Sequence, residues 1–189
     1  STLPVGRVRY GLMLREDGYV LDDGTSARLA EDHYLMTTTT AAAGLVMRHL
    51  DFVHQAHCAD WDVRFISVTE AWAQFAVAGP KARALINSLL DAPLEGFPFM
   101  AAGSLRLGST NARLFRISFS GEEGYEIAVP SRYGEALFRD LVARAETMGG
   151  GPYGMEALNV LRIEKGLITH AEIHGRVTAY DIGAEKMIS

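Results

Sequence analysis

Two runs of residues with the alternating apolar pattern of a β-strand, 112–119 and 124–129, lie on either side of a connection built on the four residues Gly-Glu-Glu-Gly, 121–124, the last of which opens the second run. This connection suits a hairpin, because its two glycines can adopt the positive φ that tight turns require. The sequence therefore predicts that the two runs pair as antiparallel strands. Any fold for this chain must contain that pair.

The second of these strands carries an acid, Glu126, inside an apolar run. Strict alternation sends Tyr125, Ile127 and Val129 to one face of the sheet, and sends Glu126 and Ala128 to the other. A solvated carboxylate is the default interpretation, since acids are rarely buried without a partner. The alternative is that Glu126 faces a cavity and accepts two parallel hydrogen bonds from paired N–H donors, such as those of a pterin or guanine ring.

Strand and helix patterns alternate along the rest of the chain. Further strands are expected at 7–14, 18–22, 33–38, 63–78 and 103–107. Helices are expected at about 40–57, 80–90, 132–148 and 154–165, the first of them capped by Thr39 or Thr40. This mixture predicts the α+β class, with antiparallel sheets and flanking helices. No internal domain boundary is visible, so residues 1–189 are treated as one region.

Composition excludes several classes of function. The chain has 189 residues, of which 48% are hydrophobic, enough for one or two compact lobes with real cores. Its 18 basic and 23 acidic residues are scattered, which argues against a nucleic-acid partner and a membrane tether. Cys58 is the sole cysteine, and the sequence shows neither an apolar run of about 18 residues nor a signal peptide. We expect a cytoplasmic location.

Both ends of the sequence predict a fragment. A strand with Val8, Tyr10 and Leu12 on one face begins almost at the N-terminus, and the chain stops without a helix cap or a closing strand. Made alone, such a piece is expected to expose a sheet edge and to associate.

A second acidic feature is the pair Asp22 and Asp23, which follows the apolar residues 19–21 and precedes Gly24. This arrangement is typical of a strand that ends in a turn, and we assign Asp23 to local turn hydrogen bonds. Asp22 continues the strand directly. Its carboxylate is a candidate to project at the rim of a pocket and stabilise positive charge on a substrate.

Histidines invite a metal interpretation that the spacing does not support. His54, His57 and Cys58 lie close together, but the segment lacks a second cysteine for a structural zinc site. His170 and His174 are four residues apart, without the glutamate of the catalytic HExxH motif. We expect no metal, and no glycine-rich loop indicates a flavin site in this chain.

Four motifs together carry a family resemblance. In order, they are "DGYVLDDG", "FPFMAAG", "FSGEEGYEIAVP" and "ALNVLRIEKG". Each is weak by itself, but their joint order and spacing resemble the folate-binding aminomethyltransferase family typified by the T-protein of glycine cleavage. The resemblance covers essentially the whole chain and is strongest for the oxidative branch, the alpha subunits of heterotetrameric sarcosine oxidases. It implies the family's fold, without its terminal barrel domain.

The resemblance assigns roles to four residues. Glu126 matches the family's pterin-binding glutamate, and Asp22 matches its catalytic aspartate beside the reactive nitrogens of the folate. Phe119 stands where the family has a tyrosine, so an aromatic wall remains without its hydroxyl. Met100 belongs to a loop that packs along the ligand, although a place in the core is an equal alternative.

Three further positions bear on the choice between branches. Leu158 replaces the T-protein arginine that contacts the folate tail, and Thr39 replaces an asparagine. These departures weaken an aminomethyltransferase interpretation more than a folate site. Arg162 is retained from the motif "LRIEKG", but its default role is an exposed ion pair with its helical neighbours.

The implied function is the capture of a one-carbon unit. The resemblance implies that tetrahydrofolate bound here takes the methylene of oxidised sarcosine, giving 5,10-methylenetetrahydrofolate and glycine. Flavin and NAD are expected only on other parts of the complex, and the partners are the other sarcosine oxidase subunits. Two alternatives stay open: a free-standing aminomethyltransferase, and a non-catalytic structural lobe.

Overall fold

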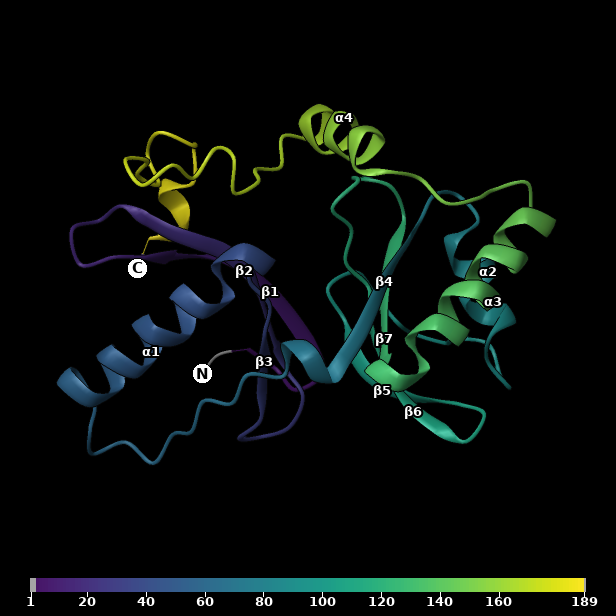
Figure 1. The fold of residues 1–189 in the computed structure, drawn as a ribbon, viewed down its shortest axis with the longest axis horizontal. Helices are drawn as coiled ribbons and strands as arrows, with labels where there is room; N and C mark the ends of the chain where they lie inside the picture. Colours follow the sequence, from purple (N-terminus) through teal and green to yellow (C-terminus); the bar gives the residue numbers. More distant parts are fainter. Residues whose placement is uncertain (1–2, 189) are drawn as a thin grey trace. The chain divides into compact units, whose positions relative to one another are not determined.

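A computed structural model describes residues 3–188 (Figure 1). The chain forms two compact units, each assembled from separate segments. Unit 1 comprises Thr69–Leu167, Arg28–His33 and the described residues up to Val8. Unit 2 comprises Arg9–Ala27, Tyr34–Val68 and the described residues from Ile168 on. No single position in the chain divides the two, and the assignment of one region stays a prediction.

Unit 1 is built on a four-stranded antiparallel sheet in the order β4-β7-β6-β5. The strands are β4 (Trp72–Ala78), β5 (Ala102–Leu107), β6 (Thr110–Phe115) and β7 (Gly124–Pro130). The predicted antiparallel pair is β6 and β7, with Phe115 opposite Glu126. The α+β class with antiparallel sheets is confirmed.

The hairpin connection is longer than the four residues predicted, because β6 ends at Phe115 and residues 116–123 are not in the strand. Arg116 does not continue the pairing with β7. Its N–H donates to Ala101 O at 2.9 Å, and its O accepts from Met100 N at 2.8 Å. The backbone of residue 116 is therefore satisfied by a segment distant in the sequence, which the local pattern does not reveal.

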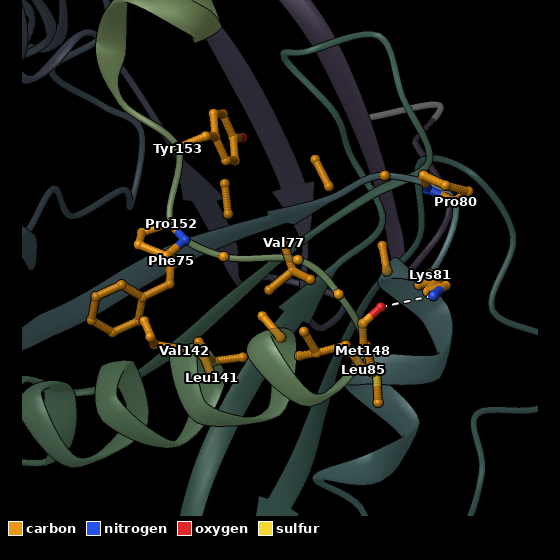
Figure 2. A pocket seen from close by; sticks show the side chains of 18 of the residues that line it. Phe75, Val77, Pro80, Lys81, Leu85, Leu141, Val142, Met148, Pro152 and Tyr153 are labelled. Carbon is orange, nitrogen blue, oxygen red and sulfur yellow. Dashed lines mark hydrogen bonds between the residues drawn. The ribbon is translucent and has the colours of Figure 1, made fainter.

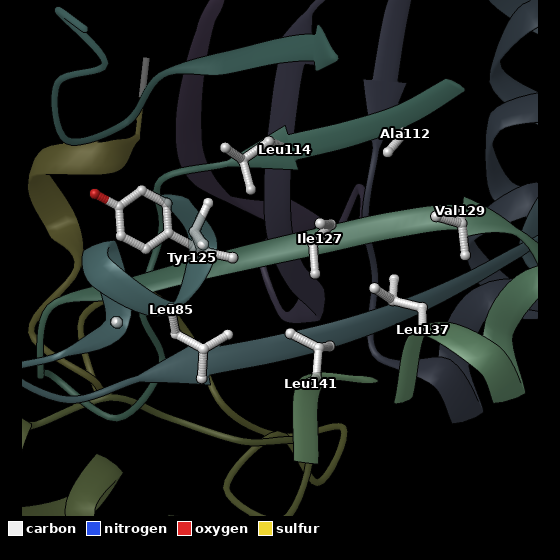
Figure 3. Close-up of a cluster of buried hydrophobic side chains, with 10 residues drawn as sticks. Leu85, Ala112, Leu114, Tyr125, Ile127, Val129, Leu137 and Leu141 are labelled. Atoms are coloured by element: carbon white, nitrogen blue, oxygen red, sulfur yellow. The ribbon is translucent and has the colours of Figure 1, made fainter. Parts of the chain in front are cut away.

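Three helices belong to unit 1: α2 (Ala82–Ser88), α3 (Gly134–Thr147) and α4 (Met155–Lys165). Leucines of α2 and α3 pack against one face of the sheet (Figure 3). On that face Tyr125 and Ile127 are 0% exposed and Val129 is 1% exposed. The predicted alternation along β7 is confirmed, and it leaves Glu126 on the face away from these helices.

Unit 2 holds a three-stranded sheet in the order β1-β2-β3 and one long helix. Its elements are β1 (Arg7–Leu14) from Arg9 on, β2 (Val20–Arg28) up to Ala27, β3 (Tyr34–Met36) and α1 (Ala43–His57). A small core joins Leu21 of β2 to Ala42 and Val46 beside it. The predicted threonine cap is wrong, because the chain enters α1 through a 3-10 turn and Ala42 occupies the N-cap position.

Within residues 3–188, four short 3-10 helices complete the fold. They are η1 (Thr40–Ala42), η2 (Thr69–Ala71), η3 (Ser131–Tyr133) and η4 (Glu185–Met187). Of the strand predicted at 63–78, only β4 forms, and an irregular segment with η2 precedes it.

The strand predicted at 18–22 is also wrong in extent, since β2 continues to Arg28 and carries both aspartates inside it. The polar run after Leu21 has the composition of a turn, but its backbone hydrogen-bonds to Thr37, the residue that follows β3. Thr37 N donates to Thr25 O at 2.8 Å, and Thr25 N donates to Thr37 Oγ1 at 3.1 Å. Pairing with a neighbouring strand has overridden the local turn preference.

Gly24 allows this pairing, because a Cβ at that position would lie 1.9 Å from the backbone oxygen of Thr37. We expect Gly24→Ala to destabilise the protein by about 2 kcal/mol or more, the cost of overpacking against rigid backbone. Gly11→Ala on β1 is the matched control, since a Cβ there meets nothing within 4 Å. Urea unfolding of the full-length protein measures both. Equal midpoints for the two variants would contradict the close approach.

Candidate functional site

Glu126 lies at the centre of the sheet of unit 1, on a strand with a neighbour on each side. Ala76 of β4 and Phe115 of β6 are its direct cross-strand partners, so all three side chains share one face. Glu126 is half-buried, and its Oε2 accepts a hydrogen bond from Gln74 Nε2. Within residues 3–188, this is the only hydrogen bond to the carboxylate, so its acceptor capacity is largely unused.

The electrostatic setting of Glu126 is unusual for a surface acid. Burial raises the pKa of Glu126, and the hydrogen bond from Gln74 offsets part of this rise. Burial also raises the pKa of Tyr153, and the charge of Glu126 raises it further. Tyr153 therefore lies within electrostatic reach of Glu126. The sequence-based prediction missed this tyrosine, for which the only local signal is an aromatic residue after a glycine run.

Phe119 and Met100 belong to the same unit as Glu126. Phe119 is half-buried in the connection 116–123. Met100 has φ of 62°, a left-handed conformation that is rare outside glycine, and its backbone is held from both sides by Val8 and Arg116. Neither side chain forms a hydrogen bond or ring contact with Glu126 in the described part of the chain, and their ligand roles stay predictions.

Asp22 belongs to unit 2, where β2 buries it completely, with 0% of the residue exposed. Its Oδ2 accepts a hydrogen bond from Thr39 N at 2.9 Å. Its Oδ1 has no hydrogen-bond partner among the described residues, and His170 Nδ1 lies 3.9 Å from it. A buried carboxylate oxygen without a donor is costly, so it marks a candidate reactive position.

Asp23 does not lie in the predicted turn. It follows Asp22 inside β2, and its Oδ2 accepts a hydrogen bond from Tyr10 OH of β1 at 2.8 Å. Burial raises the pKa of Asp23, and Asp22 adds to this rise. Burial and the charge of Asp23 raise the pKa of Tyr10 as well. The two aspartates thus lie in one partly desolvated cluster.

A pocket of about 380 Å³ lies on the helix-covered side of β4, between that strand, α2, α3 and the loop 149–153 (Figure 2). Its walls are mainly apolar, with Phe75, Val77 and Leu141 among them. Lys81 Nζ donates to Met148 O at 2.7 Å across its edge. Glu126 is not among the residues that line this pocket, although its cross-strand partner Ala76 and its neighbour Tyr153 are.

Arg162 corrects one prediction. It is only 7% exposed and its Nη1 donates to Leu167 O at 3.1 Å, so it is not a solvated ion pair. Arg162 lies on the buried side of α4, whereas Glu164 and Lys165 on the same helix are exposed.

The histidines near Cys58 have local contacts. His54 Nε2 lies 2.9 Å from Trp61 O, and His57 Nε2 lies 3.8 Å from Glu16 Oε1. Within residues 3–188, no group of three or more His, Cys, Asp or Glu side chains is arranged to hold a metal ion. None of the helices in this part of the chain combines the length and apolarity needed to cross a bilayer.

Comparison with known proteins finds two kinds of relatives, sarcosine oxidase alpha subunits and aminomethyltransferases. The chain is 51% identical over 191 residues to the sarcosine oxidase subunit alpha of Rhizobium meliloti (strain 1021), covering 99% of this chain and 19% of that protein. It is 29% identical over 189 residues to an aminomethyltransferase of Streptomyces coelicolor, covering 100% of this chain and 50% of that protein. The fold matches the glycine cleavage system aminomethyltransferase T from Bartonella henselae, with a TM-score of 0.84, 24% identity, and coverage of 100% of this chain and 49% of that one.

The chain therefore spans about a fifth of the length of the sarcosine oxidase alpha subunit and about half that of the aminomethyltransferases. The predicted resemblance to the aminomethyltransferase family is confirmed. The model of the GCVT N-terminal domain matches residues 1–189. The chain belongs to the GCVT N-terminal domain family.

Proposed function

We propose that this chain is the tetrahydrofolate-binding part of a sarcosine oxidase alpha subunit, where it captures the methylene group of oxidised sarcosine. The observation that carries the proposal is the half-buried carboxylate of Glu126, whose acceptor capacity is largely unused. The identity of 51% to a sarcosine oxidase alpha subunit supports the choice of branch.

The chemistry of Glu126 fits a pterin ring. A pterin presents an amino and an amide N–H side by side, and a carboxylate can accept both at once. Partial burial strengthens these charge-assisted hydrogen bonds, because water competes less well for the donors. Phe115 provides an aromatic neighbour on the same sheet face, and Phe119 is the second aromatic candidate.

Asp22 is the candidate for the proton transfers. Tetrahydrofolate supplies two nitrogens that take up the methylene of the sarcosine imine, and the two hydrogens they lose end on the nitrogen of the released glycine. The capture therefore consumes no net acid or base, but it needs a group that carries protons between nitrogens. The free Oδ1 of Asp22 suits this role, since the backbone N–H of Thr39 holds the other oxygen.

In this proposal, oxidation takes place elsewhere. Flavin and NAD would be held by other parts of the complex, and the partners would be the other sarcosine oxidase subunits, in the cytoplasm. Positioning of the folate by Glu126 would favour capture over hydrolysis to formaldehyde, through the high effective concentration of positioned groups.

A free-standing aminomethyltransferase is the second candidate, and identity of 29% to such enzymes supports it. Leu158 argues against it, because the T-protein arginine is absent there. A structural lobe without catalysis is the third. Titration of the full-length protein with tetrahydrofolate tests the proposal. Saturable binding is expected, and its absence would leave only the structural lobe.

Gln74 provides a test through pH. Folate binding requires the Glu126 carboxylate, whose raised pKa means that affinity falls as the pH drops through that raised value. The hydrogen bond from Gln74 holds this pKa down, so Gln74→Leu should shift the loss of affinity to higher pH. Calorimetry across pH 5 to 8 measures the shift. Gln55→Leu, on the exposed surface of α1, should leave the curve unchanged.

A further inference from the structure

Asp22 has a neighbour, His170, to which the function proposed above assigns no role. Asp22 Oδ1 is buried without a hydrogen-bond donor among the described residues, and the imidazole Nδ1 of His170 lies 3.9 Å away. The two side chains differ in their access to water: 46% of the His170 side chain is exposed, against 0% for Asp22. His170 thus contacts solvent on one side and faces the buried carboxylate on the other.

The backbone around His170 is fixed by a tight local turn. Thr169 donates to Glu172 Oε2 from its N–H at 2.6 Å and from its hydroxyl at 2.9 Å, and Glu172 N donates back to Thr169 O at 3.0 Å. These three hydrogen bonds enclose His170 between the two residues. Its position next to Asp22 is therefore defined by the fold of this segment.

The same segment is anchored to the strand that carries Asp22. Val20 N donates to Val177 O at 2.7 Å, and Tyr19 pairs with Thr178 in an isolated β-bridge. Ile173 is 4% exposed, so the segment also has a buried apolar contact. The turn with His170 and the strand with Asp22 are thus held together within unit 2.

We propose that His170 is the positioning and proton-exchange partner of Asp22. The inference rests on the proposed function, because it assumes that Asp22 carries protons during methylene capture. The Nδ1 atom of His170 lies near enough to Asp22 Oδ1 to exchange a proton with it, and the exposed side of the imidazole can exchange that proton with water. When Asp22 needs a proton, His170 gives up its own and takes another from water; in the reverse step the proton leaves by the same route.

The separation of 3.9 Å sets the geometry of this exchange. It is longer than a direct hydrogen bond but within the range of an ion pair. A displacement of the imidazole Nδ1 by about 1 Å, or one bridging water, would complete the path. Either is compatible with a side chain that is held by its backbone and open to solvent.

Other titratable groups also act on this pair. Burial raises the pKa of Asp23, Asp22 raises it further, and His170 lowers it. Tyr10 donates its hydroxyl to Asp23 and is subject to the charge of both aspartates. The imidazole of His170 therefore interacts with the carboxylates of both Asp22 and Asp23, and Asp23 already accepts a hydrogen bond from the Tyr10 hydroxyl. Of the two carboxylates, Asp22 is the better partner for His170, because its Oδ1 accepts no hydrogen bond from the described residues.

The functional test uses the full-length protein assembled with its partner subunits, and measures methylenetetrahydrofolate formed per sarcosine oxidised. We expect His170→Ala to lower this ratio about tenfold, most strongly at alkaline pH, where water supplies protons poorly. Added imidazole should restore part of it. His174→Ala, an exposed histidine of the same segment, is the matched control and should leave the ratio unchanged.

A double variant separates a direct partnership from general damage to the segment. If His170 acts through Asp22, then His170→Ala should have little further effect on the ratio in an Asp22→Asn background. Independent, multiplying effects of the two substitutions would overturn the proposal, as would failure of imidazole to restore the single variant.

A second measurement needs no folate. Diethyl pyrocarbonate modifies neutral imidazole, and mass spectrometry of the peptides follows each histidine separately. In the assembled protein at one fixed pH, Asp22→Asn should speed the modification of His170 about threefold, since the carboxylate that restrains the imidazole is lost, and should leave His174 unchanged. An unchanged rate at His170 would overturn the partnership.

Failure of the proposed function and failure of the inference about His170 give different results. If Asp22→Asn leaves the methylene yield intact, the proposed role of Asp22 fails, whatever His170 does. If Asp22→Asn lowers the yield but His170→Ala does not, the inference about His170 fails and the proposed function stands.

Discussion

Glu126→Gln is expected to weaken tetrahydrofolate binding by about tenfold or more in the full-length protein. The amide presents one acceptor where the carboxylate presents two, and it loses the charge that strengthens both hydrogen bonds. Hydrogen bonds to a charged group contribute about 1.5–3 kcal/mol, and 1.4 kcal/mol corresponds to a factor of ten. Isothermal titration calorimetry at pH 7.5 measures the change directly.

Glu122→Gln is the matched control, because Glu122 is exposed in the connection that leads to β7. It removes the same charge four residues earlier and should leave the affinity unchanged. Circular dichroism should show that both variants are folded. An affinity of Glu126→Gln equal to that of the unmodified protein would mean that Glu126 is a solvated acid, the default interpretation of its place in the strand.

The face of Glu126 could be predicted because it depends only on local alternation. A side chain in a strand points opposite to its neighbours, so burial of Tyr125 and Ile127 under α2 and α3 fixes the direction of the acid between them. The hairpin partner could be predicted for the same reason, since β6 and β7 are close in sequence.

Long-range pairing explains what the sequence did not reveal. The end of β6 depends on Arg116 bonding to residues 100 and 101, and the length of β2 depends on Thr25 bonding to Thr37. In both places the local residues favour a different structure from the one that a distant segment stabilises. Propensity is a weak guide where a neighbouring strand can override it.

In the candidate site, too, features set by the local sequence could be predicted and features set by long-range contacts could not. The family motifs predicted Glu126 and Asp22 as site residues, but not the burial of Asp22 inside a strand or the position of His170, 148 residues later in the sequence. Tyr153 was missed because its interaction with Glu126 is electrostatic and arises only in the folded unit. Contacts of this kind need the fold before they can be found.

Under the proposed function, Asp22→Asn is expected to separate methylene capture from sarcosine oxidation in the assembled enzyme. The amide has nearly the shape of the carboxylate and can still accept the hydrogen bond from Thr39 N, so the fold should persist. It cannot take up a proton as a carboxylate does, and loss of a positioned general acid–base group typically lowers a rate about a hundredfold or more. Methylenetetrahydrofolate should fall accordingly, while sarcosine oxidation continues at the flavin.

Carbon balance makes the expected result specific. Each methylene group that is not captured should be released by hydrolysis as formaldehyde, so the sum of formaldehyde and methylenetetrahydrofolate should equal the sarcosine consumed. Asp51→Asn, an exposed aspartate of α1 in the same unit, is the control and should leave the partition unchanged. Stopped-flow reduction of the flavin by sarcosine is the decisive second measurement. If flavin reduction slowed in parallel with folate product, Asp22 would act on oxidation or on assembly, and its assignment to the capture step would be wrong.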